Sequence, residues 1–263
     1  MGASMNRLQL RADSASDADL EECRPWAQAS EARRTAAVPA VFVPMHYERN
    51  YAYPLLVWLH GPGDDERQLR RIMPLLSMRN YVAVGPRGTA SGTQMSPRQP
   101  GFAWRQTQRD ILSAEQRVTE SIDLAKTRFN IHTQRIFIGG YQCGGTMAVR
   151  LALQRPDLFA GAITMSGELP RGYSPLGRLN QVRKLPLLIT YGRDGVDYGM
   201  PHVTRDLSLL HSAGMSVKLR QYPVADEMTT TMLTDVNAWL MEHVTGVPAQ
   251  ETQLACVTEG DWN

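Results

Sequence analysis

The chain has 263 residues, of which 43% are hydrophobic, and this is enough to bury one large core, so one main domain is expected. Its net charge is +2 with both signs scattered along the chain, which argues against a basic surface for nucleic acid. The three cysteines lie far apart and show no metal-ligand spacing, so neither a disulfide framework nor a structural metal site is supported.

Residues 1–38 are polar, without a sustained period, and predict a flexible or loosely docked extension. They lack the charged start, apolar stretch and small-residue cleavage site of a signal peptide. No stretch of the chain approaches the roughly 18 apolar residues that a membrane span needs. We therefore expect a cytoplasmic protein, with its main domain over residues 39–246 and a tail over residues 247–263.

The first half of the main domain alternates short apolar runs with helical patterns. Residues 53–60 form a nearly unbroken apolar run, which is typical of a strand buried on both faces of a sheet. Residues 89–108 carry Gly, Ser, Thr, Gln and Pro and predict a long loop. The other elements expected here are strands over residues 41–46 and 81–85 and helices over residues 66–77 and about 111–129.

The second half continues the same alternation. After a strand from residue 136 and a helix to residue 153, the pattern predicts strands over residues 161–166, 185–191 and 217–222 and helices over residues 203–212 and 230–244. Strands that alternate with helices at this spacing form a mostly parallel sheet. The expected fold class is therefore α/β, with a single sheet covered by helices on both faces.

The stretch from residue 136 to residue 153 places a group of glycines between its predicted strand and helix. This is the frame of a nucleophile elbow, G-x-S-x-G, in which small residues allow a turn that exposes the nucleophile. The frame falls on Gly140-Tyr141-Gln142-Cys143-Gly144, so the nucleophile position holds Gln142. A carboxamide has no proton whose removal gives a usable nucleophile near neutral pH.

Several further motifs match one family when they are taken in chain order. They are His60 to Asp64, Pro86 to Gly88, the elbow through Gly145 with Met147-Ala148, and Tyr222-Pro223 before Met228. Together they resemble the phospholipase/carboxylesterase branch of the α/β-hydrolases, the small serine esterases related to acyl-protein thioesterases, over roughly residues 41–245. The resemblance implies an α/β-hydrolase fold, a Ser-Asp-His triad, an oxyanion hole and no cofactor.

Two triad positions differ from the family besides Gln142. The histidine that follows Tyr-Pro in family members is replaced by Asp226, and an aspartate with a pKa of about 3.9 is a poor base toward an alcohol. The position of the triad acid falls by count on Gly195. Asp194 is one residue short of it and Asp197 two residues beyond it, so we expect either to be a turn carboxylate.

The oxyanion hole is altered as well. The resemblance places one donor at the backbone N–H that follows His60-Gly61, which belongs to Pro62, and proline has no N–H. The other donor, the N–H of Cys143 before Gly144, is retained. These mismatches inside a matching frame predict a non-catalytic member that binds a small acyl or ester-like molecule or a protein partner.

An active carboxylesterase or thioesterase with a rebuilt site is the alternative. The thiol of Cys143 is the candidate nucleophile, since a helix N-terminus lowers the pKa of a thiol, and His60 is its candidate partner. The register disfavours this, because Tyr141 would then stand where the elbow needs its first glycine. Ser166 is a further candidate nucleophile, whereas His243, in the last predicted helix, is expected to be an ordinary helix residue.

Overall fold

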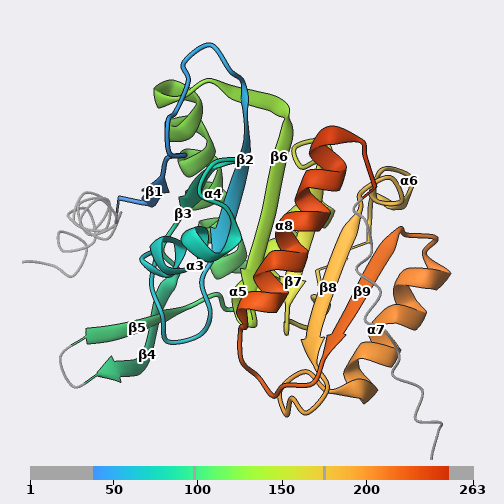
Figure 1. The fold of residues 1–263 in the computed structure, drawn as a ribbon. Coiled ribbons are helices and arrows are strands. Elements are labelled where there is room, and N and C mark those ends of the chain that lie inside the picture. The colour runs from blue at the N-terminus through green and yellow to red at the C-terminus, as the bar shows by residue number, and fades with distance from the viewer. Residues whose placement is uncertain (1–37, 97–98, 174–175, 249–263) are drawn as a thin grey trace, which may run out of the picture. The chain divides into compact units, whose positions relative to one another are not determined.

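A seven-stranded sheet with the order β1-β3-β2-β6-β7-β8-β9 is the main element of the computed structural model, which describes residues 38–96, 99–173 and 176–248 (Figure 1). Strand β1 pairs antiparallel with β3, and all other neighbours in this sheet are parallel. The mostly parallel sheet expected from the sequence is thus confirmed. Its strands are β1 (Ala40–Phe42), β2 (Tyr53–Leu59), β3 (Val82–Gly85), β6 (Ile131–Tyr141), β7 (Gly161–Met165), β8 (Leu187–Gly192) and β9 (Val217–Tyr222).

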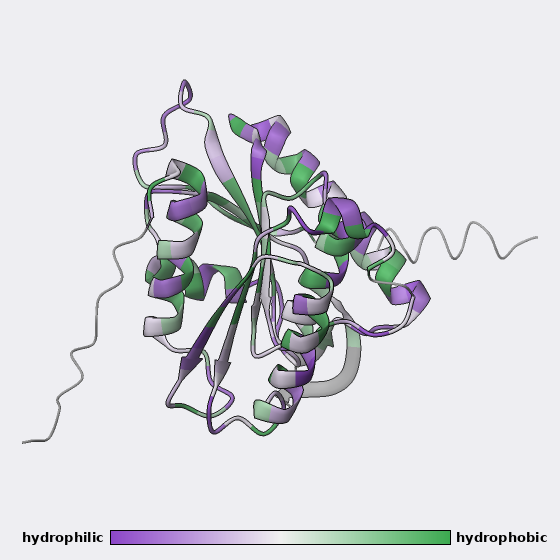
Figure 2. Cartoon of the chain, turned by 90° about the vertical axis from the view of Figure 1, so that its right-hand side faces the viewer, coloured by the Kyte–Doolittle hydropathy of each residue, from purple (hydrophilic) through white to green (hydrophobic). Residues whose placement is uncertain are grey.

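Helices cover both faces of the sheet, as Figure 2 shows with the sheet turned toward its edge. Each face has its own buried cluster of side chains, because successive strand residues point to opposite faces. One cluster joins the sheet to α3 (Gln68–Leu76) and α8 (Thr230–Thr245). The other joins it to α4 (Gln108–Arg128), α5 (Cys143–Gln154) and α7 (Met200–Ser212), while α6 (Leu179–Val182) is a single short turn.

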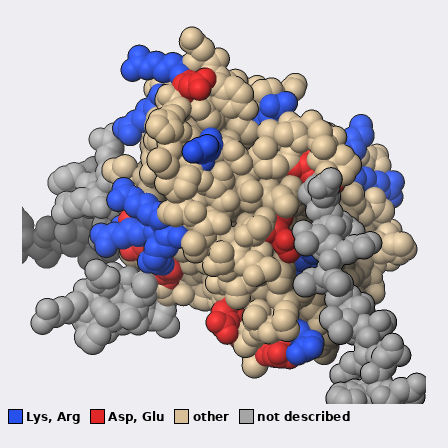
Figure 3. Space-filling model, viewed as in Figure 1, with Lys and Arg blue, Asp and Glu red and all other residues tan. Residues whose placement is uncertain are grey.

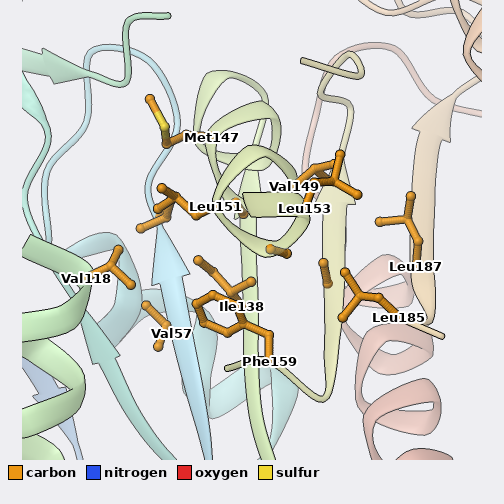
Figure 4. Packing of buried hydrophobic residues seen from close by; sticks show 14 of the residues in the cluster. Val57, Val118, Ile138, Met147, Val149, Leu151, Leu153, Phe159, Leu185 and Leu187 are labelled. Atoms are coloured by element: carbon orange, nitrogen blue, oxygen red, sulfur yellow. The ribbon is translucent and has the colours of Figure 1, made fainter. Parts of the chain in front are cut away.

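Helix α5 packs over the middle of the sheet on the second of these faces. Its residues Met147, Val149, Leu151 and Leu153 are at most 2% exposed and lie among side chains from β2, β6 and α4 (Figure 4). The close packing along almost the whole of α5 fixes where this helix begins. The start of α5 is therefore set by the core rather than by a surface loop.

The prediction of a long loop over residues 89–108 is wrong. Most of it forms an antiparallel hairpin of β4 (Thr89–Ser96) and β5 (Gln99–Ala103), which makes a separate two-stranded sheet. Composition suggested a loop because Gly, Ser and Gln dominate this stretch, but cross-strand pairing can order such residues when the backbone finds partners. Gly63 N–H, for example, donates to the carbonyl of Phe102 in β5 at 2.8 Å.

The first strand is also shorter than expected, since β1 ends at Phe42 and not at His46. Pro44 offers no N–H to a neighbouring strand, and His46 has a positive φ of 59°, which is incompatible with an extended strand. At the other end of the domain, β9 has the bounds predicted from the sequence, and α8 exceeds its prediction by one residue.

The expected extension, residues 1–38, and the expected tail, residues 247–263, fall almost wholly outside the described residues, which from Pro39 onward belong to one compact unit. Within the described ranges, no helix is both long and apolar enough to cross a membrane. On the face drawn in Figure 3, basic and acidic side chains both occur and much of the surface carries neither. This face therefore offers no extended field of a single sign.

Candidate functional site

The elbow predicted from the sequence is present between β6 and α5. Gln142 has φ 47° and ψ −116°, a combination that residues with a side chain rarely adopt, and α5 begins at the next residue. The flanking glycines are required by space, because a Cβ added at Gly140 would lie 2.5 Å from the carbonyl carbon of Gly144. The strained residue at the tip of this turn is Gln142.

The side chain of Gln142 is held by a carboxylate from a neighbouring loop. Its Nε2 donates to Oδ2 of Asp197, at 3.3 Å, in the loop that follows β8. Parallel pairing brings the carboxyl ends of β6, β7, β8 and β9 to one edge of the sheet, so loops far apart in sequence meet there. Of the two candidate carboxylates, Asp197 is brought to Gln142, whereas Asp194 is exposed and pairs with Arg193 at 3.1 Å.

Asp226 lies in the loop after β9 and supports the loop after β8. Its Oδ2 accepts hydrogen bonds from the backbone N–H groups of Val196, at 2.7 Å, and Asp197, at 3.3 Å. The hydroxyl of Tyr141, one residue before Gln142, donates to the backbone carbonyl of Asp226. The three loops are thus joined by hydrogen bonds, and Oδ2 of Asp226 accepts from two backbone donors.

The turn after β2 has little capacity to donate to a ligand. The N–H of Gly61 donates to Oε1 of Gln68 at 3.3 Å, Pro62 has no N–H, and the N–H of Gly63 is used by the β4–β5 hairpin. Gln68 is itself fixed, since its Oε1 also accepts from the indole of Trp58 at 2.8 Å. An oxyanion at this site would rely on the N–H of Cys143, at the start of α5.

His60 is a brace within this turn. Its Nδ1 lies 2.8 Å from the carbonyl of Gly61, to which it donates, and its Nε2 accepts from the N–H of Gly88 at 2.9 Å. Burial lowers the pKa of His60, which favours the neutral ring that this arrangement needs. Both ring nitrogens are therefore used by the backbone.

Cys143 is half-buried beside Gln142, and burial raises the pKa of its thiol. Within the described part of the chain, no histidine is hydrogen-bonded to Cys143, and Nδ1 of His243 donates to the carbonyl of Trp239 in its own helix at 2.9 Å. The same residues contain no group of three or more His, Cys, Asp or Glu side chains suited to a metal ion.

A cavity of about 500 Å³, which we call the elbow pocket, opens beside Gln142. It is lined by Pro62, Trp104, Gln106, Gln142, Cys143, Thr146, Ser166, Gly167, Glu168, Leu169, Arg171 and Asp197. Trp104 and Gln106 follow β5 directly, and sequence reasoning missed both because it assigned this stretch to a loop. Trp104, the single tryptophan of residues 89–108, was the available signal.

Ser166 enters the elbow pocket from the end of β7. It has a positive φ of 54° and is 3% exposed, and its N–H donates to the carbonyl of Thr190 at 2.8 Å. Its side-chain oxygen has no hydrogen-bond partner in the described structure. A strained, buried residue of this kind at the edge of a pocket is a frequent mark of a ligand-binding site.

The mostly parallel sheet, the helices on both faces and the strained elbow between β6 and α5 define an α/β-hydrolase fold. A family model described as Phospholipase/Carboxylesterase matches residues 46–244, and the chain belongs to this family.

Two curated relatives match about half of the chain. The protein named "Putative esterase NocK" of Nocardia uniformis subsp. tsuyamanensis is 30% identical over 142 residues, which are 53% of this chain and 39% of the relative. "Probable carboxylesterase Os04g0669500" of Oryza sativa subsp. japonica is 27% identical over 143 residues, 51% of each chain. The chain thus spans about half or less of the length of these relatives.

Solved structures share the fold at lower identity. Acyl-protein thioesterase 2 of Zea mays has a TM-score of 0.62 and 18% identity, covering 79% of this chain and 99% of that one. SOBER1 of Arabidopsis thaliana has a TM-score of 0.61 and 19% identity, covering 73% of this chain and all of that one (100%). At such identities the likeness concerns the fold alone.

Proposed function

We propose that this chain is a non-catalytic member of the phospholipase/carboxylesterase family, a pseudoesterase that binds a small acyl or ester-like ligand in the elbow pocket. The observation that carries the proposal is Gln142 at the strained tip of the elbow, with its carboxamide donating to Asp197. A carboxamide in this place cannot be deprotonated to attack a carbonyl carbon. The site therefore keeps the shape of a hydrolase site without its nucleophile.

The other altered positions support the same proposal. Asp226 stands where the family has its histidine, and one of its carboxylate oxygens accepts two hydrogen bonds from the backbone of the loop after β8, which fits a structural role. Pro62 removes one oxyanion donor, and in a well-studied serine protease one lost donor costs roughly 10² to 10³ in rate. The nucleophile, the base and the oxyanion donors act together in the attack on the carbonyl carbon, so the loss of all three leaves little acceleration of ester hydrolysis.

The alternative is an active carboxylesterase or thioesterase that uses Cys143. In its favour, Cys143 lines the elbow pocket, and both curated relatives carry names of esterases. Against it, burial raises the pKa of the thiol, and both nitrogens of His60 are engaged by the backbone. Ser166 as a nucleophile meets a similar objection, because its oxygen has no basic partner.

The proposal extends to partners and location. A protein partner would dock through residues 89–108, which form the β4–β5 hairpin and the segment after it, or through the terminal extensions. No nucleic acid and no cofactor are part of the proposal, and its location is the cytoplasm. Cell fractionation tests the location directly.

The decisive experiment measures hydrolysis of p-nitrophenyl butyrate by the full chain, by Cys143→Ala and by the triple variant Gln142→Ser, Gly195→Asp, Asp226→His. We expect the wild type and Cys143→Ala at the background rate, and a gain in the triple variant. Wild-type turnover that disappears in Cys143→Ala would make Cys143 the nucleophile and overturn the proposal. The matched control, Cys143→Ser, replaces the thiol with a hydroxyl on a side chain of similar size and separates loss of the thiol from loss of the side chain.

A further inference from the structure

Three side chains of the elbow pocket carry a buried polar atom that has no hydrogen-bond partner in the described part of the chain. They are Nε1 of Trp104, Nε2 of Gln106 and Oγ of Ser166. Trp104 and Ser166 are each 3% exposed. An indole N–H and an amide NH₂ can only donate, and a serine hydroxyl can also donate. Since native proteins rarely leave buried donors unpaired, the three point to a ligand that accepts hydrogen bonds.

The orientation of Gln106 follows from its neighbour Arg150. Nε of Arg150 lies 2.5 Å from Oε1 of Gln106. A guanidinium has donors and no acceptor, so the oxygen of the carboxamide must be the atom that faces Arg150. The NH₂ group is therefore the part of Gln106 left for another acceptor. The contact with Arg150 thus orients Gln106 so that its NH₂ group remains available as a donor.

Arg150 adds a positive charge behind this donor. It is fully buried, at 0% exposure, and its remaining hydrogen bonds go to the backbone carbonyls of Gly172, at 3.0 Å, and Arg171, at 2.6 Å. Within the described ranges, no carboxylate pairs with it. Burial lowers the pKa of Arg150 because it removes hydration from the cation. A buried cation with only neutral acceptors favours an anion nearby.

We propose that the elbow pocket binds a short organic carboxylate, whose oxygens accept hydrogen bonds from Trp104, Gln106 and Ser166. The inference rests on the proposed function, since it names the ligand of the same site. A carboxylate offers several acceptor sites and no donor, which matches three donors better than an amide or an alcohol does. Its carbon chain lies against Leu169, which is 6% exposed and lines the same pocket.

The acidic residues of the pocket are already paired. Glu168 binds Arg171, with 2.5 Å between Oε2 and Nη2, and lies 3.5 Å from Arg205. Asp197 accepts from Gln142 and lies in an exposed loop. The ion pairs of Glu168 and the exposure of Asp197 to solvent reduce the repulsion that a ligand carboxylate would meet. Helix α5 also begins beside the pocket, at Cys143, and the dipole of a helix favours negative charge at its N-terminus.

Titration calorimetry of the full chain with hexanoate, hexanamide and 1-hexanol tests the inference. We expect hexanoate to bind at least about tenfold more tightly than the two neutral compounds, because hydrogen bonds to a charged acceptor are the stronger ones. Trp104→Phe and Ser166→Ala each remove one donor and should weaken hexanoate binding about tenfold. The indole fluorescence change on hexanoate addition should be absent in Trp104→Phe.

Gln106→Glu is the sharpest variant, because it keeps the shape of the side chain, gives Arg150 a carboxylate partner and removes the donor. It should fold and lose hexanoate binding. The matched control is Thr190→Val. It also removes a buried hydroxyl that has no hydrogen-bond partner in the described structure, but Thr190 does not line the elbow pocket. This variant should bind hexanoate as the wild type does.

Two results would overturn the inference: equal affinity for hexanoate and hexanamide, or hexanoate binding that Gln106→Glu leaves unchanged. Either result leaves the non-catalytic assignment standing, since that assignment depends on ester turnover. Turnover of p-nitrophenyl butyrate by the wild type would instead overturn the proposed function, and the titrations contain no ester. The two failures are therefore distinguishable.

Discussion

Gly195 faces the carboxylate of Asp226 directly, since a Cβ added at Gly195 would lie 2.6 Å from Oδ1 of Asp226. A side chain at position 195 would thus point at position 226, as a triad acid points at its histidine. In this chain the space is taken by the aspartate itself, which accepts from the N–H of Val196. The absence of a side chain at 195 and the presence of a carboxylate at 226 are sterically linked.

Gly195→Asp should therefore destabilise the fold. The new carboxylate would meet Asp226 both sterically and as a like charge, and we expect a loss of about 1–3 kcal/mol in the free energy of unfolding. Adding Asp226→His should recover part of this loss, with a coupling of about 0.5–3 kcal/mol in a double-mutant cycle measured by urea unfolding. Strict additivity of the two changes would contradict the facing arrangement.

Cys143 should react slowly with iodoacetamide at neutral pH. Because burial raises the pKa of its thiol, the thiolate is scarcer than in a free cysteine, and the rate should continue to rise with pH beyond the ordinary thiol value of 9.0. Mass spectrometry of the full chain in a Cys23→Ser, Cys256→Ser background isolates this thiol. Labelling of Cys143 at pH 7 faster than that of glutathione would instead indicate an activated nucleophile.

His60 should make stability depend on pH in a defined window. Its folded pKa lies below the ordinary value of 6.5, so the unfolded chain takes up a proton first as the pH falls. The stabilisation is complete above pH 6.5 and declines below it, by up to about 1.4 kcal/mol per pH unit, until the folded pKa is reached. His60→Gln should lack this decline in urea unfolding at pH 7.5 and 5.5.

His211→Gln, at an exposed position of α7, is the control for this measurement and should keep the wild-type pH dependence. Parallel pH profiles of the wild type and His60→Gln would contradict the role of His60 as a neutral brace.

Glu66 and Arg87 form a bidentate pair that joins the start of α3 to the loop after β3. Both contacts, Arg87 Nε to Oε2 and Nη2 to Oε1, are 2.5 Å, and Glu66 is 8% exposed. Burial opposes ionisation of Glu66, but the hydrogen bonds and charge of Arg87, a backbone hydrogen bond and the charge of Arg67 together outweigh it, and the pKa of Glu66 is lowered. Glu66→Gln should cost about 1–3 kcal/mol at pH 7.

Because the pKa of Glu66 is lowered on folding, its ionised carboxylate stabilises the fold fully above the unfolded-state pKa of 4.5. This stabilisation is lost as the pH falls through the folded-state pKa. The difference between the wild type and Glu66→Gln should therefore shrink below pH 4.5 in the same unfolding assay. Glu120→Gln, on the exposed face of α4, should change stability by no more than about 0.5 kcal/mol. A constant difference down to pH 3 would contradict an ionised Glu66.

Local patterns of apolar residues predicted most of the helices and strands. The apolar run of β2 and the three-to-four residue spacing of apolar residues in α4 each indicate that the element is buried against its neighbours. This spacing depends only on whether the element is a strand or a helix, so it can be recognised without knowing which neighbour the element packs against. The β4–β5 hairpin was not predictable in this way, because its strands contain few apolar residues and depend on pairing with each other.

The sequence by itself determined the family frame and the residue at the tip of the elbow, because Gly140 and Gly144 fix the turn and Gln142 is the residue between them. Only the tertiary structure decided which side chains meet around it. Asp197 rather than Asp194 reaches Gln142, and Trp104 and Ser166, each with a buried polar atom that has no partner in the described structure, line the same pocket. The reason is physical: chain order gives the local turn, whereas these contacts arise where parallel strands end at one edge of the sheet.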